Sequence, residues 1–336
     1  MKMQQNNEKL KPIINKIMEY GDVLLISQKG YGKTNSLMVL AKEFMELPDT
    51  RVFIFEDFPK FAVEFNGSLA NYVRVLDNDV VETKDMINLN DYYLSHDKDF
   101  TVKRGSFYQQ ALENNRHLIF TMEIKDVERK AFFIYAIAQT FYRKAYLRAY
   151  KGYTKREHII FVIEESQNAF AQATLNRKIF NRLHSIFNVA RNLDLHFVLA
   201  SQRFTDLNPK IRNRTQLLIG NIHIDDYELR IHRLLRHSKY RNKILTLKVG
   251  EFLFVPSDSI VKFPKFQNNI KPKEWMIPEK PKKKTIWQKI IEAIVNPNEV
   301  KKYEKRANNE YEKFYEDEQE EDELTEEIED SYGELM

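Results

Sequence analysis

The sequence contains no cysteine, so disulfide bonds, thiol nucleophiles and zinc–thiolate sites are excluded. Its start, MKMQQNNEKLKP, lacks the apolar core of a signal peptide. The longest nearly apolar stretch, Ala131 to Tyr142, contains Gln139 and Thr140 and is too short for a membrane span. Apolar residues nevertheless make up 43% of the 336 positions and charged residues 30%. We therefore expect a folded, soluble protein of a reducing compartment, the cytoplasm.

Charge is distributed unevenly along the chain. Residues 310–336 hold 14 acidic residues and one lysine, a net charge of −13, although the whole chain carries +4. The other 309 residues therefore carry +17. A basic body with an acidic tail favours a polyanionic partner, and nucleic acid comes slightly ahead of an ordinary lysine-rich solvated surface.

Proline and glycine are scarce, and they divide the chain. Six of the ten prolines lie between Pro256 and Pro297, so we expect the compact part to end near Phe266. The predicted organisation is a domain over 1–266, with 57–116 as a candidate insertion, a Pro/Lys-rich linker over 267–284, a charged helical segment over 285–315 and an acidic disordered tail over 316–336.

Runs of Val, Ile, Leu and Phe alternate with helical patterns through the body. The predicted strands are Asp22–Ser27, Arg51–Glu56, His117–Met122, His158–Glu164, His196–Ser201, Leu217–Ile222 and Glu251–Val255, and the predicted helices are Lys33–Glu46, Lys125–Tyr150 and Asn176–Asn192. Strands that are apolar at nearly every position are typical of a sheet buried on both faces. The alternation predicts an α/β fold with a mostly parallel central sheet flanked by helices.

Three of the nine glycines, Gly21, Gly30 and Gly32, lie within twelve residues of one another. The segment Ser27-Gln-Lys-Gly-Tyr-Gly-Lys-Thr34 follows a predicted strand and matches the P-loop pattern G-x-x-x-x-G-K-[ST], with serine at the first glycine position. Glycines let backbone N–H groups close on phosphate oxygens, and the following helix adds a positive field. The predicted nucleotide-binding residues are Ser27, Gln28, Lys29, Gly30, Tyr31, Gly32, Lys33, Thr34 and Asn35.

Within this loop, we expect Lys33 to bridge the β- and γ-phosphates of ATP and Thr34 to hold Mg²⁺. The alternative is an ordinary strand-to-helix turn capped by Thr34.

Two further predicted strands end in polar side chains. The first ends in Glu164 and Glu165, a Walker B arrangement in which Glu164 reaches Mg²⁺ and Glu165 polarises the attacking water. Strand alternation directs the two carboxylates to different sides, which permits two roles. The second strand ends before Gln202, which we expect to contact the γ-phosphate or the water. The alternatives are two exposed acids that open a loop and a glutamine that points to solvent.

Taken together, these segments resemble the FtsK/HerA superfamily of ring-forming, DNA-pumping ATPases. The resemblance is carried by Ser27–Thr34, His117–Met122, Ile160–Asn168, Ala190–Arg203, Asn208–Asn213 and Gly250–Val255. It implies a RecA-like P-loop NTPase of the ASCE type that hydrolyses ATP with Mg²⁺. The Glu-Glu ending of the Walker B strand is more similar to the HerA branch than to the Asp-Glu of most NTPases.

The resemblance also implies a ring. In this family an arginine of one subunit reaches the neighbour's γ-phosphate, so we expect a homo-oligomer, a hexamer by family precedent, with Arg191, Arg203, Arg212 and Arg214 as candidates and Arg191 first. A surface or DNA-backbone contact is the alternative for each. About twenty residues precede the first predicted strand, which is similar to the stripped motors of viral genome-packaging ATPases.

Such a motor would act on double-stranded DNA, with capsid or membrane-associated viral proteins as further partners, in the host cytoplasm or the virion. Two other functions stay open: a secretion or assembly ATPase of the Zot or conjugation-coupling type, and a non-hydrolysing nucleotide-dependent switch. Hydrolysis stimulated by DNA separates the first from the second, and turnover of any kind separates the third.

Overall fold

The computed structural model describes residues 2–65, 69–82, 100–151, 157–171, 177–225 and 233–266, all within one compact unit, Met1–Pro278. The expected linker, charged helical segment and acidic tail lie outside the described residues. In the described part, no helix is both long and apolar enough to cross a membrane.

A nine-stranded sheet forms the centre of the described fold, with the order β11-β10-β9-β1-β8-β7-β2-β6-β3. Its strands are β1 (Val23–Ile26), β2 (Thr50–Glu56), β3 (Asn71–Leu76), β6 (His117–Glu123), β7 (His158–Ile163), β8 (Leu195–Ser201), β9 (Gln216–Ile219), β10 (Glu251–Phe254) and β11 (Ser259–Lys262). The strands from β9 to β3 run parallel, and β10 and β11 add an antiparallel edge. The fold is therefore α/β with a mostly parallel sheet, as predicted.

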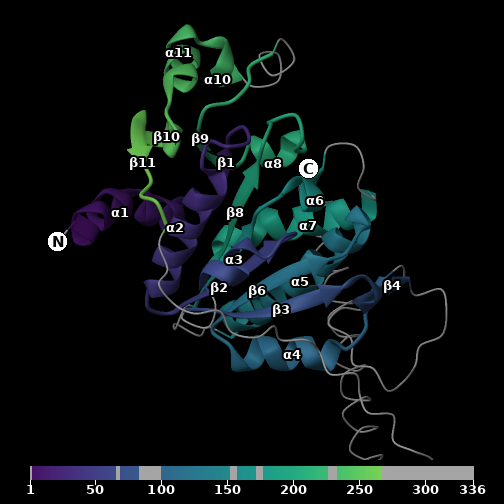
Figure 1. Cartoon of the computed structure of the whole chain (residues 1–336). Coiled ribbons are helices and arrows are strands. Elements are labelled where there is room, and N and C mark those ends of the chain that lie inside the picture. Colours follow the sequence, from purple (N-terminus) through teal and green to yellow (C-terminus); the bar gives the residue numbers. More distant parts are fainter. Residues whose placement is uncertain are drawn as a thin grey trace, which may run out of the picture. The chain divides into compact units, whose positions relative to one another are not determined.

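Helices cover both faces of this sheet (Figure 1). One face packs against α1 (Lys2–Tyr20), α2 (Lys33–Glu46) and α3 (Lys60–Phe65). The other packs against α4 (Gly105–Asn114), α5 (Val127–Tyr150), α6 (Gln167–Phe170) and α7 (Arg177–Ala190), with α8 (Pro209–Arg212), α10 (Arg233–Arg236) and α11 (Ser238–Thr246) near the β9 side. Successive residues of β1 alternate between the two cores, because strand side chains point to opposite faces in turn.

Aromatic side chains in register hold the middle of the sheet. Phe53 of β2 lies opposite Phe161 of β7, and Phe161 lies opposite Phe197 of β8. The ring centroids of these neighbours are 6.0 and 5.1 Å apart, and Phe141 of α5 packs 4.5 Å from Phe53. All four side chains are nearly fully buried. This row of rings fixes the register in which β2, β7 and β8 align.

The predicted strands and helices are all present, with ends that shift by a few residues. No element was predicted before Asp22, where the structure has the helix α1. Its buried residues Leu10, Ile13, Ile14 and Ile17 are nevertheless spaced as one face of a helix. The proline is tolerated inside α1, and that apolar face covers the sheet.

The segment 57–116 contributes to the main sheet. Its strand β3 pairs in parallel with β6 at the sheet edge, and α4 packs on the same side of the sheet as α5. A separate two-stranded sheet joins β4 (Val80–Glu82) to β5 (Phe100–Val102). No strand was predicted in this stretch, and the six residues of β3 include the polar Asn71 and Arg74.

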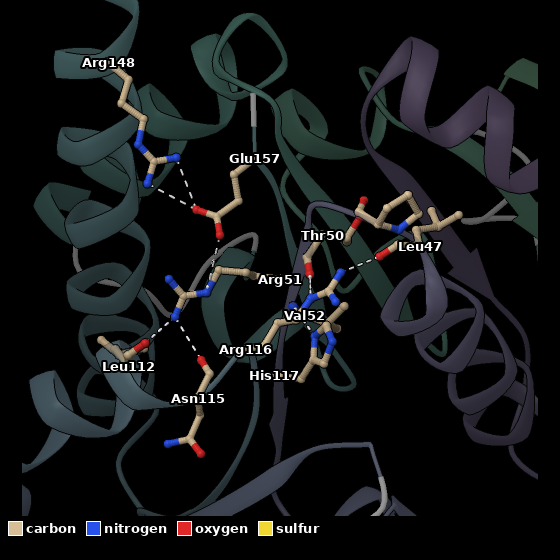
Figure 2. Close-up of polar contacts among 11 residues, drawn as sticks. Leu47, Thr50, Arg51, Val52, Leu112, Asn115, Arg116, His117, Arg148 and Glu157 are labelled. Atoms are coloured by element: carbon tan, nitrogen blue, oxygen red, sulfur yellow. Dashed lines mark hydrogen bonds and ion pairs between the residues drawn. The ribbon is translucent and has the colours of Figure 1, made fainter. Parts of the chain in front are cut away.

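Charged side chains fasten the amino ends of the strands (Figure 2). Arg51, at the start of β2, donates to the carbonyl oxygens of Leu112 and Asn115 and pairs with Glu157 at 3.9 Å. Glu157 also accepts from Arg148 of α5. Each guanidinium is therefore anchored by main-chain or carboxylate oxygens, which ties α4 and α5 to this edge of the sheet.

The first residue before β1, Asp22, is a buried carboxylate at the same edge. Its Oδ1 accepts from the backbone N–H of Phe197, 2.8 Å away. Burial raises the pKa of Asp22 to about 7, and the nearby Arg191 guanidinium opposes this shift. Because the folded chain holds a proton on Asp22 that the unfolded chain releases, folding stability falls as pH rises from about 4 to about 7.

The variant Asp22→Asn removes this contribution while its side-chain oxygen can still accept from Phe197. Between pH 4 and 7, the free energy of unfolding of the variant should fall less steeply with pH than that of the wild type, by up to about 1.4 kcal/mol per pH unit. Urea unfolding at several pH values measures this slope. The exposed Glu113→Gln is the control, and an unchanged slope in Asp22→Asn would show that Asp22 titrates normally.

Candidate nucleotide site

The phosphate loop joins β1 to α2 at the carboxyl edge of the sheet. Gly30 and Gly32 have φ angles of +88° and +87°, in the left-handed region that favours glycine. A Cβ atom on Gly32 would lie 3.2 Å from the backbone nitrogen of Gly250, so a larger residue does not fit there either. α2 begins at Lys33, directly after the loop, and no side-chain hydrogen bond from its N-cap residue, Gly32, caps it, so its N-terminus can bind an anion such as phosphate.

Three hydrogen bonds join the loop to two distant segments of the chain. The backbone N–H of Gln28 donates to the carbonyl of Asn221 at 2.9 Å, and its side-chain amide donates to the Asn221 side chain, also at 2.9 Å. On the other side of the loop, the N–H of Gly250 donates to the carbonyl of Tyr31 at 3.1 Å. The C-terminal part of the described fold therefore sets the shape of the loop.

Lys33 is a buried cation, 9% exposed, whose Nζ has no hydrogen-bond partner among the described residues. Burial lowers its pKa, and the charges of Glu165 and Glu164 act in the opposite direction. A buried ammonium without a partner is costly unless an anion completes its surroundings. This orphaned group at a helix N-terminus fits a phosphate.

Glu164 lies at the carboxyl end of β7 and is only 1% exposed. Its Oε1 accepts from the hydroxyl of Thr34 at 2.7 Å and from the Nζ of Lys60 at 2.8 Å. Hydroxyl and carboxylate oxygens are the ligands that Mg²⁺ prefers, so Thr34 and Glu164 fit the pair that would hold this ion.

The predicted residues of the two other strands reach the same place. A cavity of about 520 Å³ is lined by Gln28, Lys29, Gly30, Gly32, Lys33, Thr34, Asn35, Phe58, Lys60, Glu164, Glu165 and Gln202. Glu165 is half-buried, and its Oε2 accepts from the side-chain amide of Gln167 at 2.6 Å. Gln202 is exposed at the end of β8. The cavity therefore brings together an ammonium group, a hydroxyl, two carboxylates and an amide, the groups predicted to bind phosphate, hold a metal ion and accept a proton.

The amide of Asn35, which was predicted to bind nucleotide, makes hydrogen bonds to the protein backbone. Its Nδ2 donates to the carbonyl of Pro264 at 2.8 Å, and its Oδ1 accepts from the N–H of Phe266 at 2.8 Å. Asn35 lines the cavity, but both polar ends of its side chain anchor the segment that follows β11.

Ser27, at the first position of the loop pattern, is fully buried. Gly220 follows β9, and a Cβ atom added to it would lie only 2.7 Å from the Cβ of Ser27. Glycine at position 220 therefore provides the space that the serine side chain occupies. The departure from the pattern is accommodated by packing.

The candidate arginines lie in different surroundings. Arg191 is exposed at the amino end of β8, where its side-chain carbons pack over Gly21. It is therefore about 20 Å from the loop of its own subunit, at the opposite end of β1. Arg203 pairs with Asp225 at 3.0 Å.

The two arginines near α8 differ in exposure. Arg212 is 6% exposed, and its guanidinium donates to the carbonyls of Phe204 and Leu207. This position fastens a loop within the subunit and disfavours a reach to a neighbour, contrary to the expectation that made Arg212 a candidate. Arg214 is exposed and donates to the side chain of Asn188.

Sequence reasoning missed Phe58, Lys60 and Glu56. Glu56, at the end of β2, accepts from the N–H groups of Phe61 and Ala62 and from the Thr121 hydroxyl, at 2.7, 3.1 and 2.8 Å. Burial raises its pKa to about 7, and the charge of Glu164 adds to the shift. These residues could have been placed at the site from the sequence, because β2 was predicted and the carboxyl ends of parallel strands lie at one edge of the sheet.

Neither protein-family models nor curated proteins match the sequence. Among solved structures, the chain is similar to the genome packaging NTPase B204 from Sulfolobus turreted icosahedral virus 2 in complex with ATP-γS, with 14% identity over 74% of this chain and 98% of that chain and a TM-score of 0.43. It is also similar to EssC (ATPases 2 and 3) from Geobacillus thermodenitrificans, with 10% identity over 76% of this chain and 41% of that chain and a TM-score of 0.48.

A third similar structure is the pCW3 conjugation coupling protein TcpA with ATP-γS, with 12% identity over 75% of this chain and 62% of that chain and a TM-score of 0.41.

The class of protein is defined by the chain's own strand order and loop. β8, which ends before Gln202, lies between the P-loop strand β1 and β7, which ends before Glu164. A mostly parallel α/β sheet with this strand order and a phosphate loop after β1 is the fold expected of an ASCE-type P-loop ATPase.

The packing of Gly220 against Ser27 generates a test. Gly220→Ala should destabilise the fold by about 1–3 kcal/mol, because the new methyl group meets the Ser27 Cβ and the Phe252 ring. In a Ser27→Gly background the same change should cost less. Urea unfolding of both single variants and the double variant gives the coupling energy, and strict additivity would contradict the packing argument.

Proposed function

We propose that this protein is an ATPase that uses hydrolysis to move double-stranded DNA. The observation that carries the proposal is the convergence of Lys33, Thr34, Glu164, Glu165 and Gln202 on one cavity. The basic body, +17 outside residues 310–336, supports a nucleic-acid track, because such charge binds duplex DNA of any sequence by counterion release. Packaging of a viral genome is the form of this activity that we favour.

In this proposal the residues act in sequence on bound ATP. The loop N–H groups and Lys33 hold the phosphates, while Thr34 and Glu164 would hold Mg²⁺, which would neutralise charge on the phosphate oxygens. Glu165 accepts a proton from the attacking water, and the hydrogen bond from Gln167 orients its carboxylate. Gln202 contributes an amide that orients the water or the γ-phosphate.

Exchange of Glu165 for glutamine keeps the shape of the side chain but removes the proton acceptor. We expect Glu165→Gln to bind ATP normally and to lose turnover by roughly 10²-fold or more. Lys33→Ala should weaken both binding and turnover. The measurements are equilibrium nucleotide binding and phosphate release, each with and without duplex DNA.

The outcomes distinguish the functions considered. Turnover stimulated by duplex DNA supports the translocase, whereas turnover that only protein partners stimulate favours a secretion or assembly ATPase. Binding without turnover in the wild type identifies a nucleotide switch. Near-normal turnover of Glu165→Gln would move the proton acceptor elsewhere, to Glu164 first.

We also propose that the active form is a homo-oligomeric ring, a hexamer by family precedent. Arg191 and Arg214 are exposed and are the arginines that we favour as contacts to a neighbour's nucleotide. Arg203 is a weaker candidate, because it pairs with Asp225.

A mixture of Arg191→Ala and Lys33→Ala subunits tests the ring. One type of interface in that mixture combines an intact loop with an intact arginine, so part of the activity should return. ATPase activity against mixing ratio is the readout. Two folded variants that never rescue each other would exclude Arg191, and the same pairing with Arg214→Ala then tests the second candidate. A fully active monomer would exclude the ring.

A further inference from the structure

Lys60 lines the cavity, but the proposed hydrolysis of ATP assigns it no role. Its Nζ lies 2.8 Å from Oε1 of Glu164, the same oxygen that accepts from the Thr34 hydroxyl. Glu164 is 1% exposed, whereas the Lys60 side chain is 45% exposed and lines the cavity. One end of this ion pair is therefore fixed in the protein, and the other can move in the cavity.

The segment that carries Lys60 is itself fixed. Glu56 accepts from the N–H groups of Phe61 and Ala62, which immediately follow Lys60 at the start of α3. The backbone N–H of Lys60 donates to the carbonyl of Phe58 at 2.7 Å. The backbone at position 60 is thus held by a buried carboxylate, and only the flexible lysine side chain is left to respond to a ligand.

The strand order places Lys60 across the cavity from Lys33. Lys33 follows β1, Lys60 follows β2, and β8 and β7, with Gln202 and Glu164 at their ends, lie between them. Lys33 has no partner among the described residues, and Lys60 shares one carboxylate oxygen with Thr34. Two ammonium groups therefore flank the place that the terminal phosphate of a bound nucleotide would occupy.

We propose that Lys60 senses the γ-phosphate. Without a nucleoside triphosphate, Lys60 neutralises the buried charge of Glu164. When a triphosphate is bound, the terminal phosphate offers more negative charge and more acceptor oxygens than one carboxylate, so Lys60 donates to it and releases Glu164. A diphosphate leaves Lys60 on Glu164. This inference rests on the proposed function, because it assumes that the cavity binds ATP.

The test compares nucleotides that differ in the γ-phosphate. The variant Lys60→Met keeps the aliphatic length and removes the charge. We expect its affinity for ATP-γS to fall by about tenfold or more, while its affinity for ADP changes by less than threefold, because only the triphosphate loses a charge-assisted hydrogen bond. Lys60→Arg should restore most of the preference. Equilibrium binding by calorimetry, without turnover, is the readout.

A matched control is available outside the cavity. Lys239 pairs with Asp258 at 2.7 Å, so Lys239→Met removes a similar surface ion pair and should leave both affinities unchanged. Thermal unfolding of all variants confirms that they fold.

Two results would overturn the inference, and a third would overturn the proposed function. Equal losses of ATP-γS and ADP binding in Lys60→Met would mean that Lys60 only holds Glu164, and unchanged binding of both would mean that it does neither; each result overturns the inference. If Lys33→Ala lost binding in the same experiment, the cavity would remain the nucleotide site, and neither of these results would count against the proposed function. If Lys33→Ala bound both nucleotides normally, the cavity would not be the nucleotide site, and the proposed function itself would fail.

Discussion

The parallel alignment of β1, β8, β7 and β2 brings four strand ends to one edge of the sheet. Inside the sheet these strands are apolar on both faces, so a polar side chain is tolerated only where the strand ends. Glu164 and Gln202 directly follow such an end, and Lys33 and Lys60 begin the helices that follow β1 and β2. Residues that are far apart in the chain therefore line one cavity, and the chemistry of the site follows from the register of the sheet.

The two edges of the sheet use buried charge differently. At the amino edge, Arg51 donates to fixed carbonyl oxygens, and His117 accepts from the N–H of Val52. Burial and the neighbouring arginines lower the pKa of His117 to about 4, so its ring is neutral there. At the carboxyl edge, Lys33 is buried without a partner among the described residues, and Lys60 is half-exposed. The Arg51 guanidinium is therefore held by oxygens of the protein itself, whereas the buried Lys33 ammonium is suited to an added anion.

The C-terminal part of the described fold controls the phosphate loop. Asn221 holds Gln28, Gly250 holds Tyr31, and Gly220 leaves room for Ser27. A loop that lacks the first glycine of its pattern therefore keeps its shape through packing with β9 and β10. Asn35, in the first turn of α2 after the loop, likewise bonds to Pro264 and Phe266 after β11, so segments more than two hundred positions apart in the chain are in direct contact.

Much of the fold could be predicted from the sequence. Continuous apolar runs identify β1, β2, β6, β7 and β8, because a strand buried on both faces tolerates few polar residues. The Gly30–Thr34 segment and the Glu164–Glu165 pair indicate a nucleotide site, because phosphate and metal binding require these residue types at a strand end. The helix α1 and the strand β3 were not predicted; α1 contains Pro12 and β3 contains Asn71 and Arg74, so neither is a continuous apolar run in the sequence.

The sequence by itself determined the class of chemistry, since Lys33, Thr34, Glu164 and Glu165 lie in local motifs whose spacing is visible along the chain. Only the tertiary structure decided which other groups join them. The pairing of Lys60 with Glu164, the support of α3 by Glu56, the use of Asn35 as an anchor and the burial of Arg212 all depend on which strand ends and loops become neighbours. Those contacts join residues far apart in sequence, and the order of strands in the sheet, which no local pattern encodes, places them together.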